Sequence, residues 1–177
     1  RPTRPRHLTK PSLPSRSKRA VEAVSLGKMS LDVEQVFYRI QDRGGESFAA
    51  YLAKDLQTRG HVVTCLGFAR GDGELGPVTE SWKLLHDGAP TPRSVLSACF
   101  GLARRWRRNA PDVIVTHTQV ASLLALPIAA LVGVKHRICV HHQPHGRDLG
   151  WPFALSDAVW GTLGIYSGVV LVSDLAL

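Results

Sequence analysis

Hydrophobic and polar positions divide the chain into short apolar runs, typical of buried strands, and longer segments with apolar residues at helical spacing. Residues 36–40 form the first apolar run and predict a strand. A turn is predicted next, at Arg43, Gly44 and Gly45. The helix predicted after this turn has apolar side chains at Phe48, Tyr51, Leu52 and Leu56. Gly60 predicts the end of the helix, and residues 62–66 predict a second strand.

The alternation of strands and helices continues along the rest of the sequence. Helices are predicted at residues 94–108, 120–132 and 151–163, and strands at residues 113–116, 138–141 and 169–172. Residues 67–93 are rich in glycine and proline and predict a loop, with one short strand or turn between residues 78 and 85. Because most of the strands are wholly apolar, we expect an α/β fold, a Rossmann-like doubly wound parallel sheet with helices on both faces.

The net charge of +8 suggests a nucleic-acid contact until its location is considered. Eight of the basic residues lie within residues 1–28, against the single acidic residue Glu22, so the remainder is nearly neutral. We therefore expect residues 1–30 to be a basic disordered tail and residues 31–177 to be the folded domain. The tail also fits a transit peptide or a nucleic-acid contact, and Met29 is a candidate start site.

The cysteines Cys65, Cys99 and Cys139 lie far apart in apolar runs, which predicts buried thiols in a reducing compartment. No spacing typical of a zinc site is present. The apolar helix at residues 120–132 contains Pro127 and is too short to span a bilayer. We therefore expect a cytoplasmic protein whose apolar helix packs on the sheet.

Gly44 and Gly45 follow the end of the first predicted strand, where open α/β sheets bind ligands. Residues without a Cβ allow the backbone to approach a phosphate, and the following helix N-terminus favours negative charge. Glu46 either caps that helix electrostatically or contacts ligand hydroxyls. The alternative is a tight turn that binds nothing. The dinucleotide fingerprint G-x-G-x-x-G is absent.

Histidines end two later strands at the same predicted edge. His117 comes directly after the strand at residues 113–116. His141 and His142 end the following strand, and side-chain alternation allows only one of them to face the ligand.

The segment after these histidines is polar. His141, His142 and His145 have no obvious carboxylate partner, so we predict no metal site. Arg147 and Asp148 either contact a phosphate or a sugar or form an exposed ion pair.

Several segments match the pattern of one family in their order and spacing. They are Arg43-Gly-Gly-Glu46, Arg59-Gly-His-Val62, Pro111-Asp-Val-Ile-Val-Thr-His-Thr118, the apolar helix at residues 123–134 and Val170-Leu-Val-Ser173. With these segments, the chain from about Val33 to Leu177 resembles the N-terminal half of a GT-B glycosyltransferase of the retaining family 4. The resemblance implies that the glycine loop lies near the donor's phosphates and that His117 faces the transferred sugar as a catalytic residue. It also favours His142 over His141.

The reaction implied is transfer of a glycosyl group from a nucleotide sugar to an acceptor hydroxyl with retention. Substrate contacts would come from Gly44, Gly45, Glu46, His142 and Arg147. In this family a C-terminal domain holds most of the donor, and no second Rossmann unit follows Leu177. We therefore expect this chain to be a fragment, a domain or a degraded homologue that is inactive alone. No cofactor or metal is implied, because an Asp-x-Asp sequence is absent.

Two further interpretations of the sequence stay open. A stand-alone flavodoxin-like module would use the glycine loop to bind a nucleotide or phosphate without any transferase activity. A peripheral membrane contact is a second hypothesis, because the helix at residues 94–108 ends in a cluster of arginines. These are Arg104, Arg105, Arg107 and Arg108. The alternative is that these cations only stabilise the negative end of the helix dipole. We predict no specific nucleic-acid partner.

Overall fold

The computed structural model describes residues 29–40, 44–71, 82–86, 88–141 and 151–172. The chain divides into two units, Arg1–Ser30 and Leu31–Leu177. The described helices and strands all belong to the second unit. The prediction of a disordered tail falls on residues 1–28, which lie outside the described residues.

Six strands of the described residues form one parallel sheet, which confirms the predicted fold class. They are β1 (Asp32–Ile40), β2 (Val62–Arg70), β3 (Trp82–Leu84), β4 (Val113–Thr116), β5 (His136–His141) and β6 (Gly168–Leu171). Their order across the sheet is β3-β2-β1-β4-β5-β6. Because β1 pairs with both β2 and β4, the direction of winding reverses there. Open α/β sheets bind ligands beside such a switch point, at the carboxyl ends of the strands.

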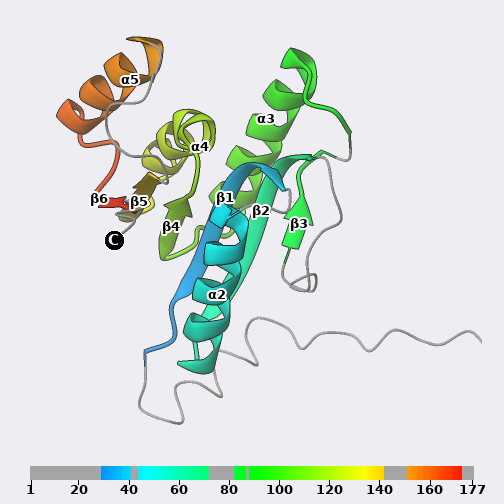
Figure 1. Ribbon diagram of the computed structural model, residues 1–177, viewed down its shortest axis with the longest axis vertical. Coiled ribbons are helices and arrows are strands. Elements are labelled where there is room, and N and C mark those ends of the chain that lie inside the picture. Colours follow the sequence, from blue (N-terminus) through cyan, green and yellow to red (C-terminus); the bar gives the residue numbers. More distant parts are fainter. Residues whose placement is uncertain (1–28, 41–43, 72–81, 87, 142–150, 173–177) are drawn as a thin grey trace, which may run out of the picture. The chain divides into compact units, whose positions relative to one another are not determined.

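Helices pack on both faces of this sheet. The helices with side chains in its apolar clusters are α2 (Gly44–Thr58), α3 (Pro92–Arg108) and α4 (Gln119–Leu131), and a further helix, α5 (Trp151–Thr162), precedes β6. Side chains of α2 share one apolar cluster with Phe37 and Val115, whereas α3 and α4 share another with Val36 and Ile114. Figure 1 shows α2 in front of β1. We call the two sides the α2 face and the α4 face.

The α2 helix has the predicted helical spacing but buries a different side from the one its large residues suggest. Ala49 and Ala53 are buried against the sheet. Phe48 and Tyr51 are 40% and 76% exposed. Small side chains allow the helix to approach the strands closely, so the larger apolar residues lie along its flank and its outer side.

Left-handed glycines follow α2 and α4, and the first of them, Gly60, ends its helix as the sequence predicts. Gly60 after α2 has a φ of 93°, and Gly133 after α4 has a φ of 82°. Most residues avoid this left-handed conformation, which glycine adopts without steric cost. After each glycine the next N–H turns back to the helix, from His61 to the carbonyl of Leu56 and from Val134 to that of Ala129.

The α3 helix begins earlier than predicted because its N-terminus has a capping box. Thr91 Oγ1 accepts a hydrogen bond from the N–H of Ser94 at 3.1 Å, and Ser94 Oγ accepts from the N–H of Thr91 at 2.8 Å. Pro92 then occupies the first helical position, where its missing N–H costs nothing.

The β2 strand corrects the prediction that a loop begins at residue 67. It continues to Arg70, and Phe68 and Ala69 are buried. Gly67 belongs inside the strand because the side chain of Ile40 occupies the space of its missing Cβ, at 2.3 Å from the ideal Cβ position. The predicted short strand between residues 78 and 85 is confirmed as β3.

A buried carboxylate on β1 holds the C-terminal part of α3. Glu34 is 2% exposed, and its Oε1 accepts a hydrogen bond from Arg105 Nε at 3.0 Å. Its Oε2 accepts from the indole Nε1–H of Trp106 at 2.6 Å. Arg105 therefore joins α3 to the sheet, whereas Arg104, Arg107 and Arg108 are exposed.

The apolar helix predicted at residues 120–132 is α4, and it packs on the sheet as expected. Ala121, Ala125, Leu126 and Ala129 are buried against the strands. No helix in the described part of the chain is long and apolar enough to cross a membrane.

Candidate functional site at the carboxyl edge of the sheet

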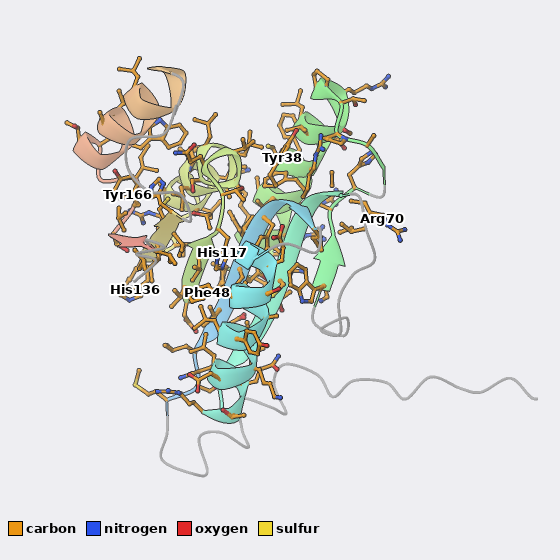
Figure 2. All side chains as sticks on the ribbon, in the orientation of Figure 1. Tyr38, Phe48, Arg70, His117, His136 and Tyr166 are labelled. Atoms are coloured by element: carbon orange, nitrogen blue, oxygen red, sulfur yellow. The ribbon has the colours of Figure 1, made fainter. Side chains whose placement is uncertain are left out.

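Two segments that the sequence marks as ligand-facing meet beside β1. One is the first part of α2, which begins at Gly44, and the other is His117, which directly follows β4. The ring centroids of Phe48 and His117 are 6.3 Å apart in an edge arrangement, and both residues are labelled in Figure 2. The structure therefore places His117 against the beginning of α2.

Backbone contacts on both sides fix the position of His117. Its N–H donates to the carbonyl of Val36 at 3.1 Å, which extends the pairing of β1 and β4. The next residue, Thr118, caps α4, since its Oγ1 accepts from the N–H of Ala121 at 3.2 Å. His117 is thus held between a strand end and a helix start.

The imidazole of His117 belongs to a row of stacked rings. It lies over the ring of Phe37 at a centroid distance of 4.6 Å with planes 3° apart. Phe37 in turn stacks with Trp82 of β3 at 5.2 Å. His117 is only 2% exposed, so the structure describes a buried histidine. The contact of His117 with a transferred sugar stays a prediction.

Gln35 of β1 connects the histidine to α2. Its Nε2 donates to the carbonyl of Ala49 at 3.0 Å, and its Oε1 lies 2.6 Å from His117 Nε2. Gln35 is fully buried, and burial of an amide is costly unless both of its polar atoms are hydrogen-bonded. One side chain thus links β1, α2 and the end of β4.

The fold does not require glycine at position 44. A Cβ placed on Gly44 meets no atom of the described residues within 4 Å, and its φ lies outside the left-handed region. Packing against the described residues therefore gives no reason for glycine there, whereas the approach of a ligand to the backbone would. Gly45 is half-buried. Glu46 is 8% exposed in the first turn of α2, where a carboxylate opposes the positive end of the helix dipole.

His141 lies on the other face of the sheet. Its Nε2 is 3.3 Å from the Sγ of Cys139, which is 3.1 Å from the Oγ of Ser122. Ser122 Oγ in turn lies 2.7 Å from Thr116 Oγ1. This polar chain on the α4 face links the ends of β4 and β5 to α4. His117 and His141 therefore point to opposite faces.

Several predicted site residues lie outside the described residues. They are Arg43, His142, His145, Arg147 and Asp148. The preference for His142 over His141 stays a prediction for this reason. One observation concerns this choice: the side chain of His141 lies on the α4 face, away from His117.

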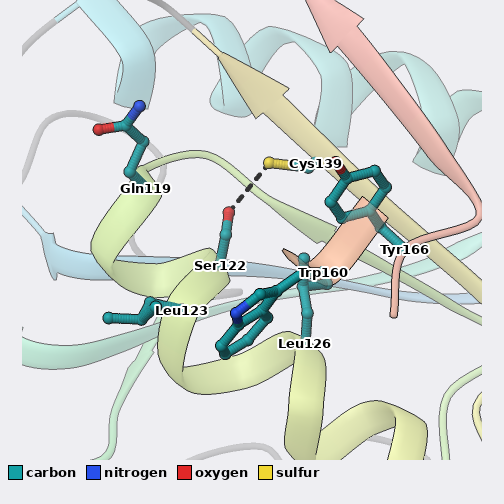
Figure 3. Close-up of a pocket in the computed structure, with 7 residues that line it drawn as sticks. All are labelled: Gln119, Ser122, Leu123, Leu126, Cys139, Trp160 and Tyr166. Carbon is teal, nitrogen blue, oxygen red and sulfur yellow. Dashed lines mark hydrogen bonds between the residues drawn. The ribbon is translucent and has the colours of Figure 1, made fainter. Parts of the chain in front are cut away.

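A small cavity adjoins the polar chain on the α4 face, and Figure 3 shows its lining. Ser122, Cys139, Trp160 and Tyr166 are among the residues around it. Its volume is about 10 Å³, the space of a single water molecule. A sugar or nucleotide does not fit there, so this cavity is not the substrate site.

Two cysteine thiols, those of Cys65 and Cys99, have raised pKa values and are therefore poor nucleophiles. Burial raises the pKa of Cys65 to about 12. Burial also raises the pKa of Cys99, although this residue is only half-buried. The prediction of buried thiols is therefore right for Cys65 and Cys139 and only partly right for Cys99. Among the residues that the structure describes, no three histidine, cysteine or acidic side chains gather as metal ligands do.

Sequence reasoning missed three residues that shape the site. Phe37 was used only to predict a strand, and Gln35 and Trp82 received no role. The one available signal was a polar residue, Gln35, beside an apolar run. Its partner His117 is 82 positions away, and no local pattern connects the two.

Comparison with protein families gives a match over most of the chain. The model of Glycosyltransferase Family 4 matches residues 43–174, which include the start of α2, His117 and β6. No curated protein matches the chain in sequence.

Solved structures share the fold at low sequence identity. The crystal structure of MurG from Acinetobacter baumannii aligns with a TM-score of 0.57 and 14% identity, over 82% of this chain and 42% of MurG. The apo form of the lipopolysaccharide outer core galactosyltransferase WaaB aligns with a TM-score of 0.48 and 9% identity, over 60% of this chain and 32% of WaaB. The chain thus spans less than half the length of either protein.

Proposed function

Because the chain belongs to glycosyltransferase family 4, we propose that it is the acceptor-side half of an enzyme that transfers a glycosyl group from a nucleotide sugar to a hydroxyl. The proposed transfer retains the anomeric configuration and uses the nucleotide sugar as co-substrate, without a separate cofactor. A C-terminal domain would supply the main contacts to the donor's diphosphate, as the 42% coverage of MurG also suggests. The family match does not favour a stand-alone flavodoxin-like module.

The observation that carries this proposal is the contact between His117 and the first part of α2. Phe48 touches the histidine ring, and Gln35 bonds both to that ring and to Ala49. A glycine-led helix N-terminus and a histidine at the switch point of the sheet are thereby brought to one place. This arrangement provides anion-favouring N–H groups beside a ring that can hydrogen-bond a sugar hydroxyl.

The roles of individual residues follow from this geometry. Gly44 and Gly45 let the donor's phosphates approach the backbone at the start of α2. His117 contacts the transferred sugar and stabilises the charge that develops there in the transition state. Since its ring is buried, Phe48 must turn away before a sugar reaches it from this side. Glu46, His142 and Arg147 are proposed as further substrate contacts.

Replacement of the histidine tests the proposal in a polypeptide that carries both halves of the enzyme. His117→Ala is expected to lower kcat/KM with nucleotide sugars by roughly 100-fold, because a positioned polar group at the reacting sugar is lost. His136→Ala is the matched control, since His136 is exposed at the start of β5 and is expected to leave turnover unchanged. Equal turnover of His117→Ala and the control would remove the proposed role.

Gly44→Ala separates the ligand role of the glycine loop from its structural role. The added methyl meets open space, and alanine favours a helix more than glycine does. The folded state should therefore gain about 0.5 kcal/mol, while donor KM rises because the methyl keeps the phosphates from the backbone. Unchanged donor KM together with raised stability would contradict the phosphate contact.

We also propose that α3 contacts an anionic lipid surface. The outer side of α3 carries Leu96 and Phe100, which are 58% and 70% exposed, four positions apart and therefore on one side of the helix. Arg104 and Arg107 continue the same side, and α3 contains no acidic residue. Apolar side chains flanked by cations match the chemistry of a negatively charged bilayer surface. Arg105 no longer belongs to this set, because it binds Glu34.

Vesicle flotation tests this membrane contact. The chain should float with phosphatidylglycerol vesicles but not with phosphatidylcholine vesicles, and added salt should weaken the binding. Leu96→Ser with Phe100→Ser should abolish flotation. Tyr51→Ser is the control, because Tyr51 is an exposed aromatic residue of α2 on the other face of the sheet. Equal flotation of both variants, or none by the unmodified chain, would contradict the contact.

A further inference from the structure

Two aromatic side chains of α2 lie at the surface beside the candidate site. Phe48 is 40% exposed, and Tyr51, three positions further along the helix, is 76% exposed. Residues three positions apart on a helix are neighbours, with Cβ atoms about 5–6 Å apart, so the two side chains adjoin each other. We call this pair of exposed rings the aromatic platform.

The aromatic platform continues outward from the histidine at the strand end. The rings of Phe48 and His117 are in edge contact with centroids 6.3 Å apart, and Figure 2 labels both residues. Because α2 begins at Gly44, Phe48 and Tyr51 lie within about two turns of its N-terminus. A molecule on the platform would therefore have one end beside His117 and the start of α2.

Apart from these two rings, the exposed side chains of α2 are polar. Ser47 and Lys54 are exposed and lie four positions before and three positions after Tyr51, on the same side of the helix. Asp55 and Gln57 are exposed as well. The outer side of α2 therefore has no long apolar stripe that would pack on another helix. It also carries charges of both signs, unlike a helix that binds an anionic bilayer.

A small apolar platform with a polar rim matches the chemistry of a sugar ring. One face of a pyranose consists of C–H groups that pack flat on an aromatic side chain, while its hydroxyls point outward and form hydrogen bonds. The hydroxyl of Ser47 and the ammonium group of Lys54 are the rim groups that suit those hydroxyls. A protein partner would need far more apolar surface, because stable interfaces bury about 800 Å² on each side.

We propose that Phe48 and Tyr51 form a subsite that binds a sugar ring of the acceptor by stacking, so that the acceptor is a saccharide or a glycoside. This inference deepens the proposed function and rests on it for the assignment of that ring to the acceptor. The assignment follows from position, since the platform lies beside His117, where the transferred sugar is proposed to bind. The binding of a sugar ring to the platform does not itself depend on transfer.

Saturation-transfer NMR of the chain with methyl β-D-galactopyranoside and methyl β-D-glucopyranoside tests the subsite directly. Transfer should reach at least one of these glycosides and should be strongest at the C–H protons of one ring face. Sorbitol, an open-chain polyol without a rigid face, should receive none. In Phe48→Leu and Tyr51→Leu the transfer should fall by roughly 5-fold, because leucine is apolar but has no flat ring. Phe48→Tyr and Tyr51→Phe keep a ring and should keep the transfer.

Phe100→Leu is the matched control, since Phe100 is a 70% exposed phenylalanine of α3, on the other face of the sheet, and it should leave the transfer unchanged. Absence of transfer to either glycoside from the unmodified chain would overturn the proposal, as would equal transfer to sorbitol. Unchanged transfer in Tyr51→Leu would overturn it as well. Because Tyr51 is exposed, this variant is expected to fold, which circular dichroism checks.

Turnover assays separate this inference from the proposed function. In a polypeptide with both halves, Tyr51→Leu should raise the KM of a saccharide acceptor by roughly 10-fold with little change in kcat, because ground-state binding is lost. A raised donor KM with an unchanged acceptor KM would mean that the ring contacts the C-terminal half, and the subsite would then be wrong.

The two proposals fail in different ways. If His117→Ala leaves turnover unchanged while a glycoside binds as expected, the transferase role of the histidine fails and the sugar subsite stands. If His117→Ala impairs turnover but Tyr51→Leu alters neither glycoside binding nor the acceptor KM, the subsite fails and the transferase role stands.

Discussion

Two neighbouring residues of β1 bury polar groups on opposite faces of the sheet, and they do so for different purposes. Glu34 binds Arg105 and Trp106 of α3, and Gln35 binds Ala49 of α2 and His117. The carboxylate is used where a helix is anchored. The neutral amide is used where a histidine is oriented.

The difference follows from what each group does to its surroundings. A buried carboxylate requires a cation and further donors, so Glu34 fixes a helix strongly but permits only one arrangement. An amide offers one donor and one acceptor without charge, so Gln35 sets the direction of a hydrogen bond at His117 without adding a full charge beside it. The face with the charged pair therefore anchors a helix, and the face with the amide carries the candidate chemistry.

The largest effect at neutral pH is expected from removal of the carboxylate. Glu34→Ala should lower the free energy of unfolding by about 3 kcal/mol, because Trp106 keeps a buried N–H without an acceptor and Arg105 loses its partner. Glu34→Gln retains an acceptor and should cost about half as much. Urea unfolding followed by circular dichroism measures both values.

An exposed ion pair provides the control for this prediction. Asp55 and Arg59 of α2 pair at 2.9 Å with both side chains mostly exposed. Asp55→Ala should change stability by less than about 0.5 kcal/mol, as such pairs are screened by water. If Glu34→Ala lowers the free energy of unfolding as little as Asp55→Ala does, burial does not make the first ion pair more important for stability than the second.

The second largest effect concerns the α2 face, where Gly67 leaves space for Ile40. Gly67→Ala should destabilise the fold by about 2 kcal/mol, because its Cβ would lie 2.3 Å from Ile40 Cγ1. Ile40→Ala in the same chain removes that atom and should relieve the clash. Additive losses in the double variant, measured by thermal unfolding, would contradict this packing.

The same glycine shows why the sequence predicted the strands better than their ends. The order of strands and helices follows from runs of apolar residues, which are local in sequence. Gly67 and Gly60 look alike in that pattern, yet one lies within a strand and the other ends a helix. The distinction depends on Ile40, which lies 27 positions before Gly67 in the chain.

The candidate site was predictable only in part for a similar reason. His117 was found because it directly follows an apolar strand, and the strand order places it at the switch point. Gln35 was not assigned because its role depends on Ala49 and His117, which the fold alone brings to it. The side of α2 that packs on the sheet was also missed, since alanines rather than large residues face the strands.

A third prediction compares thiols on the two faces. The pKa of Cys65 is raised to about 12 by burial, whereas a solvent-exposed cysteine thiol, as in the unfolded chain, has an ordinary pKa near 9.0. The folded state thus keeps a proton that the unfolded state loses as pH rises above 9. The Cys65 contribution to stability is complete below pH 9 and should fall by roughly 1.4 kcal/mol per pH unit until about pH 12.

Unfolding in urea at several alkaline pH values measures this slope. Cys65→Ala should remove that part of the pH dependence, even though its stability at neutral pH is lower. Cys99→Ala is the control, because Cys99 is only half-buried and should contribute a smaller slope. Equal slopes for the unmodified chain and Cys65→Ala would show that burial on the α2 face does not keep this thiol protonated.

The smallest effect is expected from the polar chain on the α4 face. Ser122→Ala removes the hydroxyl that lies between Thr116 and Cys139, and it should cost about 1 kcal/mol. The cost is limited because Thr116 keeps a bond to the carbonyl of Ile138. Thr162→Ala is the control, since it removes an exposed hydroxyl bonded to the carbonyl four residues earlier, as Ser122 is to that of Thr118.

The same variant also shows whether the two faces act independently. Because Ser122 and His117 lie on opposite faces, Ser122→Ala should leave the ¹⁵N NMR shifts of the His117 ring unchanged while it lowers stability. Gln35→Leu should change those shifts, because it removes the side-chain oxygen that lies 2.6 Å from His117 Nε2. A shift in the His117 pattern upon Ser122→Ala would mean that the faces are coupled through β4, and the division between a stabilising face and a chemical face would then be wrong.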